Sequence, residues 1–148
     1  MKCIGIIWNS ALKFQEDILK LINSNCKVND SYTLHLNSQY EDFVRKLYGL
    51  DQIAEWKINK KLEYMRKESD STDVIIIIFE IISSETFYNS FKQTNVCAKL
   101  ELLKTLIRLT CSIRMENYFF DITFHCSDTE EEFEKDLTLV RQFKNKGL

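Results

Sequence analysis

The apolar run at positions 74–79 is the feature that most constrains the fold of this chain. Its six residues, Val-Ile-Ile-Ile-Ile-Phe, include five β-branched side chains and follow the polar turn Ser69–Asp73. Such a run favours a strand, and unbroken apolar sequence is typical of a strand that is buried on both faces. The run is far too short to cross a bilayer. It therefore predicts a central strand from Val74 to about Ile82.

Apolar residues at other spacings predict how the chain is organised around this strand. Three further strands are expected, at Lys2 to Trp8, Val28 to Leu36 and Tyr118 to Phe124. Helices are expected over about Leu12 to Ile22, Tyr40 to Lys67 with a break near Gly49-Leu50-Asp51, Val96 to Ile113, and Ser127 to Phe143. The stretch Ser83 to Asn95 follows neither pattern.

The resulting order of elements predicts an α+β fold. Two β-α-β halves around an inserted helical segment are what a ferredoxin-like split β-α-β domain requires. We therefore expect a four-stranded antiparallel sheet with the helices on one face. With 148 residues and no repeat or linker, the chain is expected to form a single domain, residues 1–148.

Composition argues against several classes of protein. A net charge of -2 gives no general attraction to nucleic acid or to an anionic membrane. Only three glycines are present, so there is no glycine-rich phosphate loop of the Walker or Rossmann type. Five cysteines without paired spacing indicate reduced thiols. The strand-like start lacks the cleavage region of a signal peptide, so a cytoplasmic protein is expected.

Residues 121–128, Asp-Ile-Thr-Phe-His-Cys-Ser-Asp, carry the most informative chemistry. They place His125, one of two histidines, at the end of an apolar run. Ser127 and Glu130 have the spacing of a capping box, so a helix is expected to begin just after the histidine. An imidazole in this position serves either as a nucleophile or general base, or as a half-buried structural residue that donates one hydrogen bond.

In the order of its elements and in short motifs, the chain resembles the nucleoside diphosphate kinases. The matching segments are Ile4-Gly5-Ile6-Ile7, Phe14 to Ile22, Val74 to Glu80, Leu106-Ile107-Arg108 and Phe124 to Asp128. The last segment resembles the family's phosphohistidine motif, in which a histidine closes a strand before an acidic helix. The resemblance implies a nucleotide-binding phosphotransferase in which His125 is phosphorylated and Asp136 orients the imidazole. It also implies a ferredoxin-like fold and a homo-oligomer.

Several positions differ from the family pattern. Trp8, Asn9 and Ser10 stand where the family has a lysine, a proline and an acidic residue that hold phosphate. Cys126 replaces the glycine after the histidine, and Ile122 replaces an asparagine three residues before it. These differences favour a divergent relative with altered chemistry, or one that binds nucleotide without turning it over.

Phosphoryl transfer requires cations around the phosphate. Arg108 and Lys104 lie four residues apart on one face of an expected helix, and Arg114 is a third candidate for phosphate binding. The alternative for Arg108 and Lys104 is a solvated helix surface on which they pair with Glu101.

A second basic group lies on the helix expected before residue 67. Lys57, Lys60 and Lys61 are close in sequence, and Lys57 shares a helix face with each of the other two. These lysines either close over an anionic ligand, with Lys57 and Lys60 binding phosphate, or form an ordinary basic helix face.

Two aspartates are candidate ligands for Mg²⁺, the cation expected to neutralise phosphate charge. Asp128 follows the histidine motif and either binds the metal or caps the next helix. Asp121 lies four residues before His125, which is the same face of a regular strand. It would bind a cation, hydrogen-bond the ring, or simply end the strand.

The leading hypothesis is a protein that binds a nucleotide or another phosphorylated small molecule and transfers or hydrolyses a phosphoryl group through His125. The alternative is a non-catalytic interaction module of a larger assembly. It would dock an acidic partner through Lys57 to Lys67 or through Ser83 to Asn95. No membrane partner is expected. RNA binding is disfavoured because the strand Val74 to Ile78 offers no aromatic platform.

Overall fold

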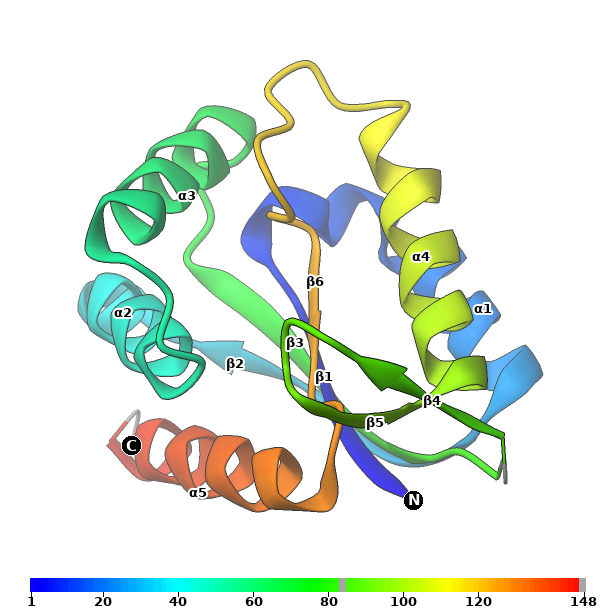
Figure 1. The fold of residues 1–148 in the computed structure, drawn as a ribbon. Helices are drawn as coiled ribbons and strands as arrows, with labels where there is room; N and C mark the ends of the chain where they lie inside the picture. The colour runs from blue at the N-terminus through cyan, green and yellow to red at the C-terminus, as the bar shows by residue number, and fades with distance from the viewer. Residues whose placement is uncertain (83–84, 147–148) are drawn as a thin grey trace.

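A computed structural model describes residues 1–82 and 85–146 and has the expected mixed architecture of helices and antiparallel strands (Figure 1). The strands are β1 (Lys2–Ile7), β2 (Lys27–His35), β3 (Asp73–Glu80), β4 (Thr86–Asn89), β5 (Thr94–Cys97) and β6 (Phe124–Cys126). The α-helices are α1 (Gln15–Asn25), α2 (Tyr40–Leu50), α3 (Glu55–Glu68), α4 (Ala98–Ser112) and α5 (Glu130–Lys146). Two 3-10 helices, η1 (Asn9–Phe14) and η2 (Asn37–Gln39), precede α1 and α2. No helix within the described residues is long and apolar enough to span a bilayer.

The main sheet has the strand order β2-β3-β1-β6, and all neighbouring strands are antiparallel. β1 and β3 form its centre, with Ile6 opposite Ile76. β6 pairs with the other side of β1 and places His125 opposite Ile6. The predicted fold class and the predicted central strand are therefore confirmed.

Helices cover both faces of this sheet, so the prediction of helices on one face is wrong. Helices α2, α3 and α5 pack over the face on which Ile6 and Ile76 are buried. Helices α1 and α4 pack over the opposite face, where Ile7 and Ile75 are buried. The reason lies in β3 itself. Consecutive side chains of a strand point to opposite faces, so an unbroken apolar run needs a covering layer on each side.

The last strand, β6, is shorter than predicted and begins later in the sequence. β6 begins at Phe124, whereas the aromatic sequence before it belongs to the connection between α4 and β6. Phe119 stacks on Tyr64 of α3 with ring centroids 4.8 Å apart, and Phe120 meets Trp56 edge-on at 6.2 Å. Phe120 also has a φ of 49°, which no strand residue adopts. These aromatic residues therefore pack against α3 instead of extending the sheet.

Gly5 lets the β6 strand approach β1 closely. A Cβ atom at this position would lie 2.7 Å from the Phe124 ring, well inside the normal contact distance. Phe124 is fully buried in the layer formed with α1 and α4. The glycine therefore helps to fix the strand that carries His125.

The stretch that followed no sequence pattern contains the hairpin β4–β5, while positions 83 and 84 lie outside the described residues. The side-chain oxygen of Asn89 closes the hairpin turn by accepting hydrogen bonds from the backbone N–H groups of Phe91 (3.0 Å) and Lys92 (3.1 Å). Val96 pairs with β4, so the following helix begins at Ala98 and not at Val96. This hairpin brings Lys92 next to the histidine motif.

Candidate functional site

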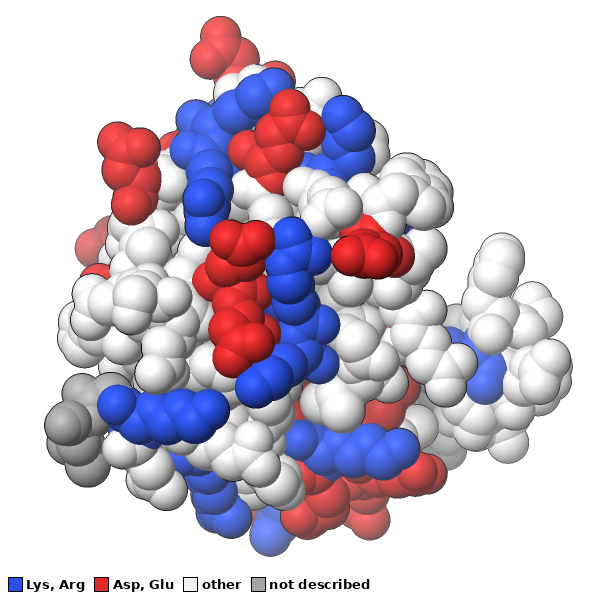
Figure 2. Space-filling model, turned by 90° about the vertical axis from the view of Figure 1, so that its left-hand side faces the viewer, with Lys and Arg blue, Asp and Glu red and all other residues white. Residues whose placement is uncertain are grey.

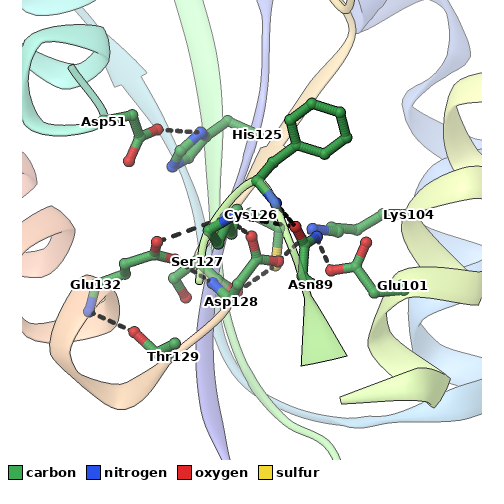
Figure 3. A network of polar contacts seen from close by, with 12 residues as sticks. Asp51, Asn89, Glu101, Lys104, His125, Cys126, Ser127, Asp128, Thr129 and Glu132 are labelled. Atoms are coloured by element: carbon green, nitrogen blue, oxygen red, sulfur yellow. Dashed lines mark hydrogen bonds and ion pairs between the residues drawn. The ribbon is translucent and has the colours of Figure 1, made fainter. Parts of the chain in front are cut away.

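His125 lines a cavity of about 250 Å³ between the sheet, the helices α2, α3, α4 and α5, and the hairpin. The other charged residues around this cavity are Asp51, Lys61, Lys92, Glu101, Lys104, Arg108, Asp121, Asp128 and Glu132. They come from parts of the chain that are far apart in sequence, as Figure 3 shows for Asp51, Lys104 and Asp128. The fold therefore gathers charged groups of both signs around one imidazole.

The imidazole of His125 is held between two carboxylates. Its Nε2 atom lies 2.8 Å from Oδ2 of Asp136, which is itself buried on α5. Its Nδ1 atom lies 3.8 Å from Oδ2 of Asp51, a cavity residue after α2 (Figure 3). An ionised carboxylate only accepts hydrogen bonds, so the contact with Asp136 places the ring proton on Nε2. This tautomer leaves a lone pair on Nδ1, the nitrogen nearer to Asp51.

The start of α5 brings Asp136 to the ring. Thr129 caps the helix, because the Glu132 N–H donates to the Thr129 hydroxyl at 3.1 Å, and the Glu132 carboxylate accepts from the Asp128 N–H, one residue before the cap, at 2.6 Å. The prediction that Ser127 caps this helix is wrong. The Ser127 hydroxyl instead accepts a hydrogen bond from the Ile4 N–H of β1 at 3.0 Å.

Asp128 is fully engaged by lysines. Its two carboxylate oxygens accept from Lys104 and Lys92, which come from α4 and the hairpin turn. Lys104 also lies 2.8 Å from Glu101, so the pairing with Glu101 considered from the sequence is present. Burial lowers the pKa of Lys104, because a charged ammonium is less stable away from water. The structure thus places Lys104 and Asp128 at the cavity, paired with each other.

Arg108 and Asp121 form a second ion pair at the cavity. Nε of Arg108 lies 2.7 Å from Oδ2 of Asp121, although the angle is not that of a hydrogen bond. Nη2 of Arg108 donates to the Phe124 carbonyl oxygen at 3.2 Å. Asp121 precedes β6 and does not share a strand face with His125, so that placement was wrong. Its carboxylate contacts Arg108 because the segment before Phe124 is not extended strand.

Lys61 is the lysine of α3 that reaches the cavity. Its Nζ atom donates to the Asp121 carbonyl oxygen at 2.6 Å and lies 4.7 Å from the centre of the Tyr48 ring. Burial lowers the pKa of Lys61 to about 8. The sequence contained a signal for this residue, since Lys61 falls between Ile58 and Met65 on the apolar face of α3.

Three other predicted phosphate ligands lie elsewhere. Lys57 stands over the Phe120 ring at 4.1 Å, and Lys60 pairs with Glu63 at 3.3 Å on the exposed side of α3. Arg114 pairs with Asp17 of α1 at 2.9 Å. Helix geometry explains these errors, because α3 turns only the Lys61 face inward and Arg114 follows the end of α4 on its α1 side.

Basic residues do not form a single-sign surface on α2 and α3. Figure 2 shows red and blue side chains next to one another on this side of the molecule. Glu41 pairs with Arg45 at 3.0 Å and with Arg66 at 3.5 Å, and Glu63 lies 3.6 Å from Lys67. This mixture of charges gives little support to an acidic partner docking on α3.

The two predicted magnesium ligands do not fit that role. Asp128 already binds two lysines and Asp121 binds an arginine. In the part of the chain that the structure describes, no three His, Cys, Asp or Glu side chains are grouped as metal ligands. Mg²⁺ also binds through substrate phosphates with few protein ligands, so a nucleotide can bring the ion with it.

Residues 8–10 have structural roles in place of phosphate binding. The Trp8 ring is fully buried against Phe43 and Tyr48. The Asn9 side-chain oxygen accepts from the Tyr40 hydroxyl at 2.8 Å, and the Ser10 hydroxyl donates to a backbone carbonyl. This segment therefore joins η1 to the core, consistent with the absence of the family's lysine.

Comparison with known proteins gives a likeness in structure alone. No protein-family model matches the chain, and no curated protein sequence matches it. The nucleoside diphosphate kinase of Aquifex aeolicus superposes with a TM-score of 0.53 at 9% identity, over 94% of this chain and 93% of that chain. A nucleoside diphosphate kinase family protein from Babesia bovis gives 0.54 at 14% identity, over 93% and 86% of the two chains.

A third similar structure is the Halobacterium salinarum nucleoside diphosphate kinase in complex with CDP. It gives a TM-score of 0.52 at 12% identity, over 94% of this chain and 86% of that chain. These likenesses extend over nearly the whole described chain. The protein therefore has a nucleoside diphosphate kinase-like fold, and the expected distant resemblance is confirmed at the level of structure.

Proposed function

We propose that this protein binds a nucleotide or a related phosphate ester and transfers its terminal phosphoryl group through His125. The observation that carries the proposal is the orientation of the imidazole. Asp136 contacts Nε2 at 2.8 Å, while Nδ1 is directed toward the Asp51 side of a cavity lined by four basic side chains. Because Asp136 fixes the ring proton on Nε2, the lone pair of Nδ1 is available to act as a nucleophile.

In the proposed step, the Nδ1 lone pair attacks the terminal phosphorus of the ester. The N–P bond forms as the bond from phosphorus to the leaving oxygen breaks, and the leaving group departs with the electrons of that bond. Asp136 stabilises the positive charge that develops on the imidazole. A second nucleophile, either a phosphate oxygen of an acceptor or water, then removes the phosphoryl group and restores the free histidine.

Lys61 and Arg108 support phosphate binding in different ways. Lys61 donates to a backbone carbonyl and forms no carboxylate ion pair among the described residues, so its charge is available to an anion. Arg108 is about one-third exposed and presents a planar guanidinium that suits phosphate oxygens. The cavity volume of about 250 Å³ suits phosphoryl groups, which leaves the sugar and base of a nucleotide outside it.

The test is a phosphorylation assay with γ-labelled ATP supplied as its magnesium complex. The wild-type protein should acquire a label that is acid-labile and alkali-stable, and mass spectrometry should locate it on His125. His125→Asn should abolish the label, and Asp136→Asn should slow its formation about 10²-fold or more. Thermal unfolding of each variant establishes that it is folded.

Lys61→Gln and Lys60→Gln provide a matched pair on the same helix. Lys61→Gln should weaken nucleotide binding about tenfold or more, because it removes a charge at the cavity. Lys60→Gln should leave binding unchanged, because Lys60 pairs with Glu63 on the exposed face. A wild-type protein that binds no nucleotide and accepts no label would overturn the proposal, as would a label on another residue.

A further inference from the structure

The hairpin β4–β5 brings one cation, Lys92, to the cavity. The two strands of the hairpin form a sheet of their own, separate from the main sheet. Lys92 is the only charged residue in positions 86–97. It lines the cavity and pairs with Asp128 and Glu132 at the start of α5. The hairpin therefore adds to the cavity a positive charge that comes from outside the main sheet and its helices.

The turn of the hairpin fixes the backbone from which Lys92 extends. The side-chain oxygen of Asn89 accepts hydrogen bonds from the N–H groups of Phe91 and Lys92. An asparagine that binds the backbone a few residues further on holds a tight turn in one conformation. Figure 3 shows Asn89 on the same side of the cavity as Lys104 and Asp128. The direction of the Lys92 side chain therefore depends on Asn89.

Lys92 can leave its carboxylate partner without stranding a buried charge. Asp128 is buried, but Lys104 remains on its other oxygen when Lys92 moves away. Arg108 differs, because it is the one cation that forms an ion pair with Asp121 among the described residues. The Lys92 side chain is also 38% exposed, whereas that of Lys104 is 6% exposed. Of the ion-paired cations at the cavity, Lys92 is thus the one most easily transferred to a ligand.

Lys92 also acts on the part of the cavity that Nδ1 of His125 faces. Asp51 lies 3.8 Å from this nitrogen. Burial raises the pKa of Asp51, and the positive charge of Lys92 is one of the groups that oppose the rise. The ammonium is therefore close enough to affect the carboxylate in front of the proposed nucleophile. A phosphate that enters between Nδ1 and the hairpin would meet the same charge.

We propose that Lys92 binds the phosphate of the ligand, and that it does so by exchanging the Asp128 carboxylate for a phosphate oxygen. This inference rests on the proposed function, because it concerns a ligand of the same cavity. The lysine ammonium is a compact charge on a flexible stem, so it can move between two acceptors. Lys104 continues to neutralise Asp128 after the exchange. Asn89 acts as a positioning residue, because it holds the turn from which Lys92 reaches the cavity.

The experiment is calorimetric titration of the full chain with inorganic pyrophosphate at about 0.15 M salt, which screens distant charges. Lys92→Gln should weaken binding about tenfold or more, because it removes a charge-assisted contact. Lys92→Arg keeps the charge and should bind within about threefold of the wild type. Lys99→Gln is the matched control, since Lys99 is an exposed lysine of α4 that does not line the cavity, and it should leave binding unchanged. Thermal unfolding establishes that each variant is folded.

Asn89→Ala tests whether the turn positions the lysine. This substitution removes no charge, yet it should weaken pyrophosphate binding about threefold or more, because the N–H groups of Phe91 and Lys92 lose their acceptor. In the Lys92→Gln background it should have no further effect, since the two residues act through one contact. A purely structural role of Asn89 would weaken binding equally in both backgrounds.

Four results would each overturn the proposal: a wild-type protein that binds no pyrophosphate, a Lys92→Gln variant that binds as tightly as the wild type, a Lys92→Arg variant that binds as weakly as Lys92→Gln, or independent effects of the substitutions at positions 89 and 92. Failure of the proposed function is measured separately, by the label on His125. Pyrophosphate binding that depends on Lys92, without a label from ATP, would support the role of Lys92 and contradict phosphoryl transfer.

Discussion

Lys61 gives the sharpest test of the cavity's electrostatics, because its pKa is lowered to about 8 from an ordinary 10.5. Its side chain is only 5% exposed, and burial is the largest cause of the shift. The perturbation is Lys61→Met, which keeps an unbranched side chain and removes the charge. The expected result is a pH-dependent difference between the unfolding free energies of the two proteins.

The sign of this difference follows from proton binding. Between pH 8 and 10.5 the unfolded chain keeps the Lys61 proton while the folded protein releases it, so the wild-type protein gains stability as pH rises. Below pH 8 both states are protonated and the cost of the buried charge is fully present. The drop in pKa corresponds to roughly 3 kcal/mol at 1.36 kcal/mol per pKa unit.

The assay is urea unfolding of wild type and Lys61→Met, followed by far-ultraviolet circular dichroism under reducing conditions. Wild-type stability minus variant stability should increase by roughly 3 kcal/mol from about pH 7 to about pH 10.5. Other titrating groups are common to both proteins and cancel in the difference. Lys60→Met is the control, because Lys60 is on the same helix but its side chain lies on the exposed face and pairs with Glu63. A flat or falling difference for Lys61→Met would refute the argument.

Three further substitutions test other parts of the structure. Gly5→Ala should lower the free energy of unfolding by about 1–3 kcal/mol, because the new Cβ atom would meet the Phe124 ring at 2.7 Å; chemical denaturation measures this. Thr129→Ala should cost about 1 kcal/mol through loss of the α5 cap, read out in the same way. Asp128→Asn should destabilise the protein by about 1–3 kcal/mol near neutral pH, because it removes one of the two carboxylates that pair with the buried ammonium of Lys104. The loss should shrink at alkaline pH, where Lys104 releases its proton.

The sequence predicts the central strands of the sheet better than it predicts which faces the helices cover or where the last strand begins. The run from Val74 to Phe79 marks a strand buried on both faces, and Gly49-Leu50-Asp51 marks the end of α2. β6 has only three residues, too few to show an alternating pattern of their own. The aromatic residues before it have the composition of a strand, yet they pack on α3, and this contact depends on the tertiary structure.

Sequence spacing also limits what can be predicted about the cavity. Asp136 lies eleven positions after His125, a spacing that matches a known family pattern, and the structure places these side chains in contact. Lys92 reaches Asp128 only through a hairpin for which the sequence had no recognisable pattern. Lys61 belongs to the lysine group that the sequence predicts to close over an anion, and its position within the apolar face of α3 distinguishes it from the other two lysines. Lys57 and Lys60 are close to Lys61 in sequence, but Lys57 stands over the Phe120 ring and Lys60 pairs with Glu63 on the exposed face of the helix.

The ion pairs around His125 supply the cavity with counterions of its own. A singly charged anion would gain little by replacing Asp121 at Arg108 or Asp128 at Lys104, because its contact would be about as strong as the carboxylate contact that it replaces. A phosphate group carries more charge and three strong acceptor oxygens, so it can exchange with these carboxylates and still gain contacts. Chloride or acetate should therefore compete poorly, whereas a polyphosphate should compete well. Asp121 and Asp128 thus make the cavity selective for ligands of high negative charge density.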